Sequence, residues 1–358
     1  MRVLVVNAGS SSLKLSLLDG EDGTVAATEL DAPRAEVAAG DVREALAEHG
    51  LQGADAVGHR IVHGGTRFTA AVTVDDDVAA ALRALTDLAP LHQPKSLAAL
   101  EAVSAALPDV PAVACFDTSF HATIPDAAAT YALPAAWRER WQLRRFGFHG
   151  LSHAWVARRV GRARVVSCHL GAGASLCAIR DGRSVDTTMG FTPLEGLVMA
   201  TRSGSVDPGL VLWLLEHGEL GERELAEALE HDSGLVGLAG VADMREVLRR
   251  AGAGDGPARL ARDVYVHRLR AGIAAMAASL GGLDALAFTG GVGEHAAEIR
   301  RRAAEGLDFL GVAIDDDKNA GAAADAEIGA AGAAVRTHVI AAREDREIAR
   351  QVRGLLGG

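Results

Sequence analysis

The chain opens with VLVVNAGSSSLKLSLLDG (residues 3–20), and this stretch decides how the N-terminal half folds. Four apolar residues lead into an Asn-Ala-Gly-Ser-Ser-Ser segment, after which leucines alternate with other residues as far as Asp19-Gly20. The pattern predicts a buried strand, a turn of small residues and a second strand. Such a turn offers many backbone N–H groups and hydroxyls at close range, which is typical of an anion-binding turn.

The same layout occurs a second time in the chain. The segment RVLVVNAGSSSLKLSLLDG from Arg2 aligns without a gap with RVVSCHLGAGASLCAIRDG from Arg164, at an offset of 162 positions. Each copy reads as a strand, a small-residue turn, an alternating strand and an Asp-Gly turn. A repeat at this domain-sized spacing favours duplication. We therefore expect two similar halves, each presenting a glycine-rich hairpin to bound phosphate.

A third glycine-rich turn, FTGGVGEH (288–295), follows the apolar segment 283–287 and precedes a helical pattern over residues 296–307. Strand, glycine turn and helix in this order are typical of phosphate or nucleotide binding. The turn is not a strict P-loop, so a purely structural turn remains open as an alternative. Elsewhere apolar runs alternate with helical patterns at 75–89, 258–280 and 344–356, which predicts an α/β fold.

Composition narrows the class of protein. A length of 358 residues favours two domains, and a net charge of −11 disfavours a general nucleic-acid or anionic-membrane surface. The three cysteines show no metal-binding spacing, which fits a reducing compartment. The apolar start is too short for a signal peptide, and no apolar run approaches a membrane span. We expect a cytoplasmic protein that binds neither nucleic acid nor membrane.

Five short segments concentrate charged and imidazole groups. They are GHRIVHGG (58–65), PLHQP (90–94), CFDTSFHATIP (115–125), RRFGFHGLSH (144–153) and MGFTPLEGLVMATRSGSVDPG (189–209). Arg60 lies at a strand end and can offer a two-pronged fork to a carboxylate or phosphate. Asp117 follows an apolar run, at the kind of strand end where α/β sheets place ligands.

Histidines recur in these segments at a spacing of four residues, as at 59 and 63 and at 149 and 153. Neither pair has the glutamate that follows the first histidine of a helical zinc motif, and glycines interrupt both pairs. Structural histidines are therefore the favoured interpretation for most of them. His149 is the exception, because it lies in a turn between Phe148 and Gly150, before a predicted helix.

Together these motifs closely resemble the acetate kinase family. The matching segments NAGSSSLK, GHRIVHGG, FDTSFH, RRFGFHGLSH, GFTPLEGLVMATRSG, DMR (243–245) and FTGGVGE are all family motifs and cover the chain from residue 3 to about residue 349. The resemblance implies two duplicated ribonuclease H-like domains around a nucleotide cleft, as in the superfamily of sugar kinases, heat-shock proteins and actin. It implies an N-terminal domain of residues 1–150, joined by a C-terminal helix at about 344–358, and a nucleotide-binding domain of residues 151–343.

The reaction implied by the resemblance is reversible phosphorylation of acetate by ATP. Acetate is already ionised at neutral pH, so the chemistry needs charge neutralisation rather than a general base. By resemblance, Arg60 and Arg202 flank acetate and the phosphoryl group, and His149 hydrogen-bonds the transition state. The family treats Asp117 as an essential acid; metal positioning or arginine orientation is the favoured role, and a structural salt bridge is the alternative.

The remaining assignments also come from the resemblance. The metal ligands are Asn7 and Glu344, for Mg²⁺ or Mn²⁺. The acetate methyl contacts Val62, Leu91, Phe148 and Pro193. The residues assigned to ATP or ADP are Ser10, Ser12, Lys14, His169, Leu170, Gly171, Ala172, Gly173, Asp243, Met244, Arg245, Gly291, Val292, Gly293, Glu294 and His295. A homodimer is implied as well.

Several positions depart from the family pattern. Ala172 replaces an asparagine, Ser205 an acid, His295 an asparagine and Gln93 an asparagine, while Glu344 is kept among changed neighbours. A lost hydrogen bond to a charged group is worth about 1.5–3 kcal/mol, so Ala172 predicts weaker ATP binding rather than none. Two alternatives stay open: a kinase of propionate or butyrate, and a nucleotide-binding paralogue with little or no turnover.

Overall fold

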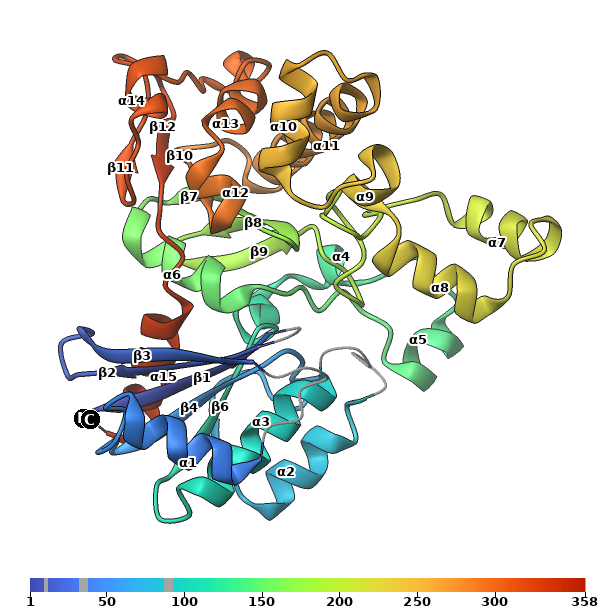
Figure 1. The fold of residues 1–358 in the computed structure, drawn as a ribbon. Coiled ribbons are helices and arrows are strands. Elements are labelled where there is room, and N and C mark those ends of the chain that lie inside the picture. The colour runs from blue at the N-terminus through green and yellow to red at the C-terminus, as the bar shows by residue number, and fades with distance from the viewer. Residues whose placement is uncertain (10–11, 32–37, 87–92, 358) are drawn as a thin grey trace. The chain divides into compact units, whose positions relative to one another are not determined.

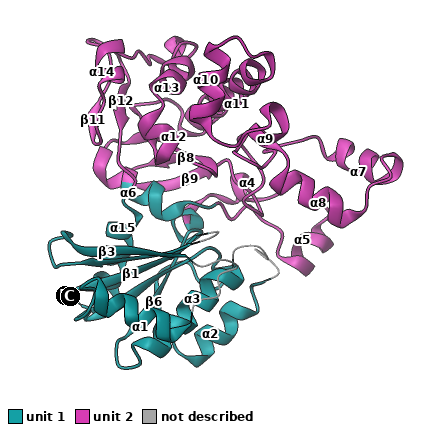
Figure 2. Ribbon diagram, in the orientation of Figure 1, with its two compact units in different colours: residues 1–122, 148–155, 343–358 teal, residues 123–147, 156–342 magenta. Residues whose placement is uncertain are grey.

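A computed structural model describes residues 1–9, 12–31, 38–86 and 93–357 of the chain (Figure 1). The chain divides into two compact units (Figure 2): unit 1 comprises residues 1–122, 148–155 and 343–358, and unit 2 comprises residues 123–147 and 156–342. Each unit contains a six-stranded mixed sheet with helices. The predicted α/β fold with two similar domains is confirmed.

The sheet of unit 1 has the strand order β3-β2-β1-β4-β6-β5. Its strands are β1 (Val3–Ala8), β2 (Ser12–Leu18), β3 (Thr24–Asp31), β4 (Ala56–Ile61), β5 (Val72–Thr73) and β6 (Ala112–Phe116). β1, β4 and β6 run parallel, whereas β2, β3 and β5 pair antiparallel with their neighbours. The carboxyl ends of the three parallel strands therefore share one edge of the sheet, where α/β proteins bind ligands.

Helices cover both faces of this sheet, which explains why β1 begins with four consecutive buried residues. Leu4 and Val6 pack into a core with α1 and α3, whereas Val3 and Val5 pack against α15 on the other face. The helices of unit 1 are α1 (Ala39–Glu48), α2 (Asp76–Arg83), α3 (Gln93–Ala106) and α15 (Glu344–Leu356). The short 3₁₀ helix η3 (Ser119–Thr123) and helix α6 (Gly150–Val160) each begin in unit 1 and end in unit 2.

The C-terminal helix lies very close to the sheet at one point. A Cβ atom on Gly58 would lie 2.5 Å from Ile348 Cγ2 and 2.9 Å from Val352 Cγ2. Any larger residue at position 58 would push α15 away from β4. The glycine therefore fixes the depth at which α15 packs, and with it the position of Glu344 at the start of that helix.

The sheet of unit 2 repeats the layout, with the order β11-β12-β10-β7-β8-β9. Its strands are β7 (Arg164–Leu170), β8 (Ala174–Arg180), β9 (Arg183–Thr187), β10 (Ala285–Thr289), β11 (Ala326–Glu327) and β12 (Arg336–Val339). β7, β10 and β12 run parallel, as do β1, β4 and β6 in unit 1. Read in reverse, as β9-β8-β7-β10-β12-β11, this order matches that of unit 1 strand for strand. The match is the duplication that the sequence repeat predicts.

The two hairpins differ by one residue, although their sequences align without a gap. Ala8 pairs with Leu13 in the first hairpin, whereas Leu170 pairs with Ala174 in the second. Four positions of sequence therefore separate the first pair and three separate the second. The turns close with hydrogen bonds from Gly9 N to Ser12 O (2.7 Å) and from Gly171 N to Gly173 O (2.9 Å). A one-residue change in pairing register places side chains differently along the second strand.

The helices of unit 2 are α4 (Asp126–Ala129), α5 (Ala135–Trp141), α7 (Pro208–His217), α8 (Glu222–His231), α9 (Gly234–Ala239), α10 (Met244–Gly252), α11 (Gly256–Leu280), α12 (Gly290–His295), α13 (Ala297–Ala304) and α14 (Asp316–Ala320), with the 3₁₀ helix η4 (Asp308–Leu310). The helical pattern at 258–280 is confirmed as α11, which Asp255 caps by accepting from Ala258 N. The pattern at 75–89 forms a shorter helix, α2, and residues 87–89 lie outside the described chain.

Candidate active site

Three polar side chains meet at the carboxyl edge of the unit 1 sheet, one from each parallel strand or its end. Arg60, on β4, donates through Nε and Nη2 to the carboxylate of Asp117, with the shortest distance, 2.7 Å, from Nη2 to Oδ2. Its Nη1 donates to Asn7 Oδ1, on β1, at 3.1 Å. The two-pronged contact fixes the plane of the guanidinium.

Charges around Arg60 hold it in the ionised form. Glu344 Oε2, from α15, lies 3.8 Å from Arg60 Nη1. Burial lowers the pKa of Arg60, but the carboxylates of Asp117 and Glu344 raise it by more, so the guanidinium stays charged. The Arg60 side chain is 21% exposed and that of Asp117 only 2% exposed. Asp117 therefore serves as a buried anchor, while part of Arg60 faces solvent.

The turn before α6 places His149 and Phe148. Gly150 N donates to Asp117 O at 2.8 Å, and a Cβ atom on Gly150 would lie 2.2 Å from that same carbonyl. His149 itself has a positive φ of 56°, which is uncommon outside glycine. Both features bring the start of α6 against the residue that anchors Arg60.

Phe148 is buried and held from two sides. Its carbonyl accepts from His121 Nε2 at 3.0 Å, and its ring meets His63 edge to face, with centroids 5.5 Å apart. Burial lowers the pKa of His121 to about 4, so the ring is neutral and donates from Nε2. Val62 is 8% exposed. Leu91, the other apolar residue assigned to this side of the site, lies outside the described residues.

Gln93, one of the departures from the family pattern, is buried beside these residues. Its Oε1 accepts from His63 N at 3.2 Å, and its Nε2 donates to His63 O at 3.1 Å. The side chain thus pairs with one residue's backbone in both directions. The longer amide is accommodated with its hydrogen bonds satisfied.

The first small-residue turn is only partly described. Ser10 lies outside the described residues, and Ser12 Oγ donates to Glu29 Oε1 at 2.5 Å. Lys14 pairs with Glu29 at 3.8 Å, and its side chain is 59% exposed. Both described side chains are therefore directed to β3 in this structure.

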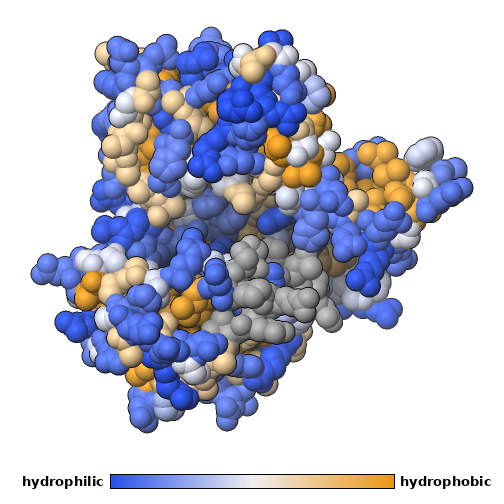
Figure 3. All heavy atoms as spheres, in the orientation of Figure 1, coloured by the Kyte–Doolittle hydropathy of each residue, from blue (hydrophilic) through white to orange (hydrophobic). Residues whose placement is uncertain are grey.

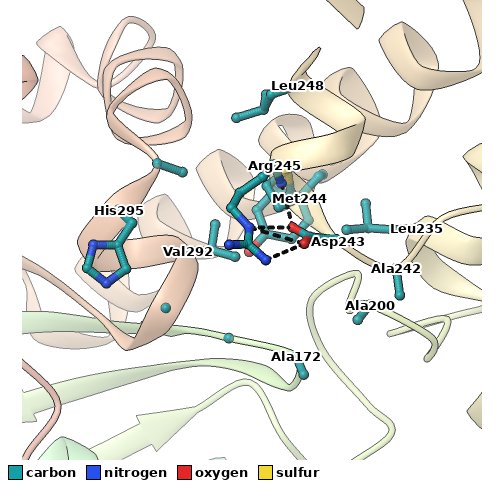
Figure 4. Close-up of a pocket in the computed structure, with 14 residues that line it drawn as sticks. Ala172, Ala200, Leu235, Ala242, Asp243, Met244, Arg245, Leu248, Val292 and His295 are labelled. Atoms are coloured by element: carbon teal, nitrogen blue, oxygen red, sulfur yellow. Dashed lines mark hydrogen bonds and ion pairs between the residues drawn. The ribbon is translucent and has the colours of Figure 1, made fainter. Parts of the chain in front are cut away.

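Unit 2 carries an open pocket of about 550 Å³ (Figure 4). Its lining residues are Gly171, Ala172, Ala200, Leu235, Ala242, Asp243, Met244, Arg245, Leu248, Tyr265, Gly291, Val292, His295 and Ala296. The lining is mostly apolar with a few polar groups, and its volume falls in the range of small-ligand sites. Three regions supply most of the lining: the β7–β8 turn, the segment at the start of α10, and α12 with the residue after it. Ala200, Leu235 on α9 and Tyr265 on α11 complete it.

An ion pair fixes the polar side of the pocket. Arg245 Nη2 lies 2.6 Å from Asp243 Oδ2, and Arg245 N donates to Asp243 Oδ1 at 2.9 Å, so that Asp243 also caps α10 (Figure 4). The hydrogen bonds from Arg245 hold the pKa of Asp243 below its ordinary value. Because both side chains lie near solvent, a polar ligand can reach them.

Eight of the residues that the resemblance assigns to ATP line this pocket: Gly171, Ala172, Asp243, Met244, Arg245, Gly291, Val292 and His295. His169, Leu170, Gly173, Gly293 and Glu294 belong to the same turns but are not among the lining residues, and Ser12 and Lys14 belong to unit 1. The sequence analysis assigns no binding role to the other lining residues, which are Ala200, Leu235, Ala242, Leu248, Tyr265 and Ala296. Alanine and leucine in such a wall look the same as core residues in a sequence.

The glycine-rich helix α12 is fastened at both ends. Glu294 Oε1 accepts from Gly290 N at 3.1 Å and from Ala342 N at 3.0 Å. Arg300, only 1% exposed, donates through Nη1 to the carbonyls of Gly293 and Glu294 at 2.9 and 2.8 Å. Glu294 therefore supports the pocket wall from behind rather than lining it.

Arg202 lies in unit 2 on the segment after β9. Its Nη1 donates to Pro193 O at 2.9 Å. Burial lowers its pKa, and the nearby Glu230 carboxylate partly opposes that shift. Pro193 thus contributes its carbonyl to the orientation of Arg202, which is a different contact from the methyl contact assigned to it by resemblance.

Two similar α/β domains, one with a fixed arginine at its strand ends and the other with a nucleotide-sized pocket, form the architecture of actin-like kinases. The chain belongs to the acetokinase family, which its sequence matches over residues 35–350.

Relatives of known name agree with this assignment. The chain is 52% identical to the acetate kinase of Nostoc punctiforme over 304 residues, covering 82% of this chain and 75% of that protein. Its structure is similar to that of Porphyromonas gingivalis acetate kinase, with a TM-score of 0.90, 33% identity and 99% of each chain covered. It is similar to a propionate kinase from Francisella tularensis with a TM-score of 0.90, 34% identity and 98% of each chain covered.

Among the helices of the described chain, none combines the length and the apolar character that crossing a membrane requires.

Proposed function

We propose that this chain transfers the γ-phosphoryl group of ATP to acetate, reversibly, giving acetyl phosphate and ADP by direct in-line transfer. The observation that carries the proposal is the Arg60 cluster, in a member of the acetokinase family. Arg60 uses three of its five N–H groups on Asp117 and Asn7 within the described part of unit 1. One N–H on each terminal nitrogen then remains for an anion.

The proposed chemistry requires neutralisation, because two anions must approach each other. Arg60 neutralises the acetate carboxylate, and Asp117 holds the guanidinium in one orientation at no further entropy cost during the reaction. Arg202 and His149 contribute N–H donors to the charge that develops on the transferred phosphoryl group. The carboxylate of acetate is the nucleophile, so no proton is removed from it.

The nucleotide is proposed to occupy the pocket of unit 2. Its apolar walls suit an adenine ring, and Asp243 and Arg245 suit the hydroxyls of a ribose. Backbone N–H groups of the 171–173 turn then approach the phosphates. This assignment makes Ala172 a pocket residue that offers no side-chain hydrogen bond.

Mg²⁺, with Mn²⁺ as a substitute, is the metal that fits the proposed site. Asn7 and Glu344 offer hard oxygen atoms, and both oxygens lie near Arg60 Nη1. Within the described residues no three His, Cys, Asp or Glu side chains converge on one point. Two protein oxygens, supplemented by phosphate and water, are the usual way in which Mg²⁺ binds beside a nucleotide. The bound ion would neutralise phosphate charge.

The test is formation of acyl phosphate, trapped as the hydroxamate, with ATP and Mg²⁺ across acetate, propionate, butyrate and no acid. We expect acetate to give the largest kcat/KM. If folded protein that binds ATP forms no acyl phosphate with any of the three acids, the proposal is overturned and the nucleotide-binding paralogue is favoured.

Propionate is the second candidate substrate, because the propionate kinase from Francisella tularensis is 34% identical to this chain. One extra methylene changes specificity by only about 1–3 kcal/mol, so use of both acids is compatible with one pocket. A larger kcat/KM for propionate in the same assay would assign the chain to that substrate. If butyrate gave the largest kcat/KM, the chain would be assigned to butyrate instead.

We further propose that the chain forms a homodimer through α7. Three large apolar side chains on this helix, Leu210, Leu212 and Trp213, are 48%, 60% and 55% exposed, and Figure 3 shows apolar surface over α7. An apolar patch of this kind is typical of an interaction surface. Light scattering after gel filtration should report a dimer that Trp213→Glu dissociates. Leu260→Glu, on another exposed apolar residue, should leave the mass unchanged.

A cytoplasmic location completes the proposal, because ATP is the co-substrate and because Cys115, Cys168 and Cys177 are buried thiols. Cell fractionation tests it. Recovery of the protein with an exported fraction would contradict it.

A further inference from the structure

Glu195 is the centre of a hydrogen-bonded cluster that the proposed reaction does not yet explain. Tyr131 Oη donates to Glu195 Oε2 at 2.6 Å, and Arg145 Nη2 donates to Oε1 at 2.7 Å. Both oxygens of the carboxylate are therefore engaged, each by a different partner. All three residues belong to unit 2.

The two partners of Glu195 also hold the backbone that precedes it. Arg145 Nη1 donates to the carbonyls of Thr187, Thr188 and Met189 at 3.2, 3.1 and 3.0 Å. Tyr131 Oη accepts from Phe191 N at 2.9 Å. The chain from the end of β9 to residue 191 is thus fixed by the same side chains that bind Glu195.

Gly190 shows how tightly this cluster is packed. A Cβ atom at position 190 would lie 1.7 Å from Glu195 Oε2 and 2.2 Å from Tyr131 Oη. Its carbonyl accepts from Phe146 N at 3.0 Å and from Gly147 N at 3.2 Å. Only glycine lets the carboxylate and the phenol lie directly against the backbone.

The loop 190–196 leads from this cluster to Arg202. Pro193 O accepts from Arg202 Nη1 at 2.9 Å. At the end of the loop, Gly196 N donates to Ser205 Oγ at 3.1 Å and Gly196 O accepts from Ser205 N at 3.0 Å. The loop therefore contacts the guanidinium itself and the backbone three residues beyond it.

We propose that Glu195 is a positioning residue for Arg202, acting through the loop 190–196. This inference rests on the proposed function, in which Arg202 binds the transferred phosphoryl group. Within the described chain, Glu195 and Arg202 share no hydrogen bond or ion pair. It fixes the backbone that supplies Pro193 O, and that carbonyl fixes one terminal nitrogen of the guanidinium. A catalytic arginine needs such support, because small displacements of a catalytic group are expensive.

The first test compares Glu195→Gln with the wild type in acyl phosphate formation. The amide keeps the shape of the side chain but removes its charge and one acceptor. We expect kcat to fall about 10–100-fold, with the KM for ATP within about twofold, because the nucleotide pocket is built by other residues. Glu298→Gln is the matched control. Glu298 also pairs with arginines, Arg262 and Arg302, and its side chain is likewise 34% exposed. Its kcat should be unchanged.

The second test is a double-mutant cycle, which separates positioning of Arg202 from general damage. If Glu195 acts through Arg202, Glu195→Gln should lower the residual rate of the Arg202→Ala enzyme less than about threefold. An equal loss in both backgrounds would overturn the proposal. Tyr131→Phe, which keeps the Arg145 pair, should show the same non-additivity with a smaller effect.

A third readout does not depend on catalysis. Hydrogen exchange at the amides of residues 190–205 should accelerate in Glu195→Gln and stay unchanged at residues 243–248, four of which line the pocket. Unchanged exchange at 190–205 would refute the support role even in an active enzyme. Failure of the wild type to form any acyl phosphate would instead refute the proposed function, and the exchange experiment would still report on the loop.

Discussion

At the scale of single residues, the contact between Asp117 and Arg60 bears on the role of the carboxylate. Asp117 accepts from two nitrogens of Arg60, which is the geometry of an anchor for the guanidinium. The structural salt bridge and the orienting role are thus one arrangement. The carboxylate's contact with Arg60 gives no reason to assign it a proton-transfer role.

We predict that Asp117→Asn will lower kcat by at least about 100-fold while ATP affinity stays within about twofold. The amide leaves the partly buried arginine with a weaker partner, so the guanidinium loses its orientation. Isothermal titration and initial rates measure the two quantities. Asp284→Asn is the matched control, because Asp284 likewise accepts from Nε and Nη2 of one arginine, Arg164, at the start of β7. A comparable loss of kcat in both variants would contradict the prediction.

Ala172 makes a second prediction at this scale. Because it lines the pocket, Ala172→Asn should add a hydrogen-bond donor facing the nucleotide and tighten ATP binding up to about tenfold. The measurement is the Kd for ATP by titration calorimetry. An unchanged or weaker affinity would mean that this turn does not contact phosphate.

Gln93 shows why residue-level predictions stop short of the structure. The sequence marks it as a departure from an asparagine, but its partner is the backbone of His63, 30 positions earlier. Nothing in the local pattern connects the two segments. The same holds for Tyr131, whose phenol meets Glu195 only once the fold exists.

At the scale of elements, the duplicated hairpin was the most predictable feature. Two strands, an intervening small-residue turn and the matching order of both sheets follow from the repeat. The one-residue difference between the turns was not predictable. A gap-free alignment compares side chains, whereas register depends on which backbone groups pair across the turn.

The support of α12 makes the prediction for this scale. Arg300→Met should weaken ATP binding about tenfold or more and lower the melting temperature. The substitution leaves the carbonyls of Gly293 and Glu294 without their buried donor and frees the helix that carries Val292. Arg301→Met is the neighbouring control, since in the part of the chain that the structure describes Arg301 pairs with Glu305 alone, on the surface. ATP affinity equal to that of the control would show that α12 keeps its position without Arg300.

Pocket walls illustrate the limit of prediction for elements. Glycine turns and the Asp-Met-Arg segment were recognisable because their residue types are unusual in such positions. Ala200 and Leu235 line the same pocket but carry no comparable signal. Apolar residues that line a pocket show the same sequence patterns as apolar residues of the core, so only the packing in the structure distinguishes the two.

At the scale of the whole molecule, unit 1 is assembled from three separate segments of chain. Its C-terminal helix, α15, packs against strands from the N-terminal part of the chain, with Ile348 and Val352 beside Gly58. The amphipathic pattern of residues 344–356 predicts a helix, but it does not say which sheet the helix covers. That choice depends on complementary packing between residues about 290 positions apart.

Unit 1 also contains buried histidines, and three of them, His59, His63 and His121, make the last prediction. Burial lowers the pKa of His59 to about 3 and those of His63 and His121 to about 4. In the unfolded chain a histidine titrates near 6.5. Between about pH 6.5 and pH 4 the unfolded state therefore binds protons that the folded state excludes. The free energy of unfolding should fall with pH over that range, by about 1–2 kcal/mol per histidine at pH 5.

His59 provides the sharpest test of this pH dependence, because its ring nitrogens have no hydrogen-bond partner among the described residues. His59→Leu should keep most of the stability at pH 7 and lessen its loss between pH 7 and pH 5, as measured by urea unfolding at several pH values. His217→Leu, on a side chain that is 55% exposed, is the control and should leave the slope unchanged. A slope in His59→Leu equal to that of the wild type would mean that the buried imidazole is not what excludes the proton.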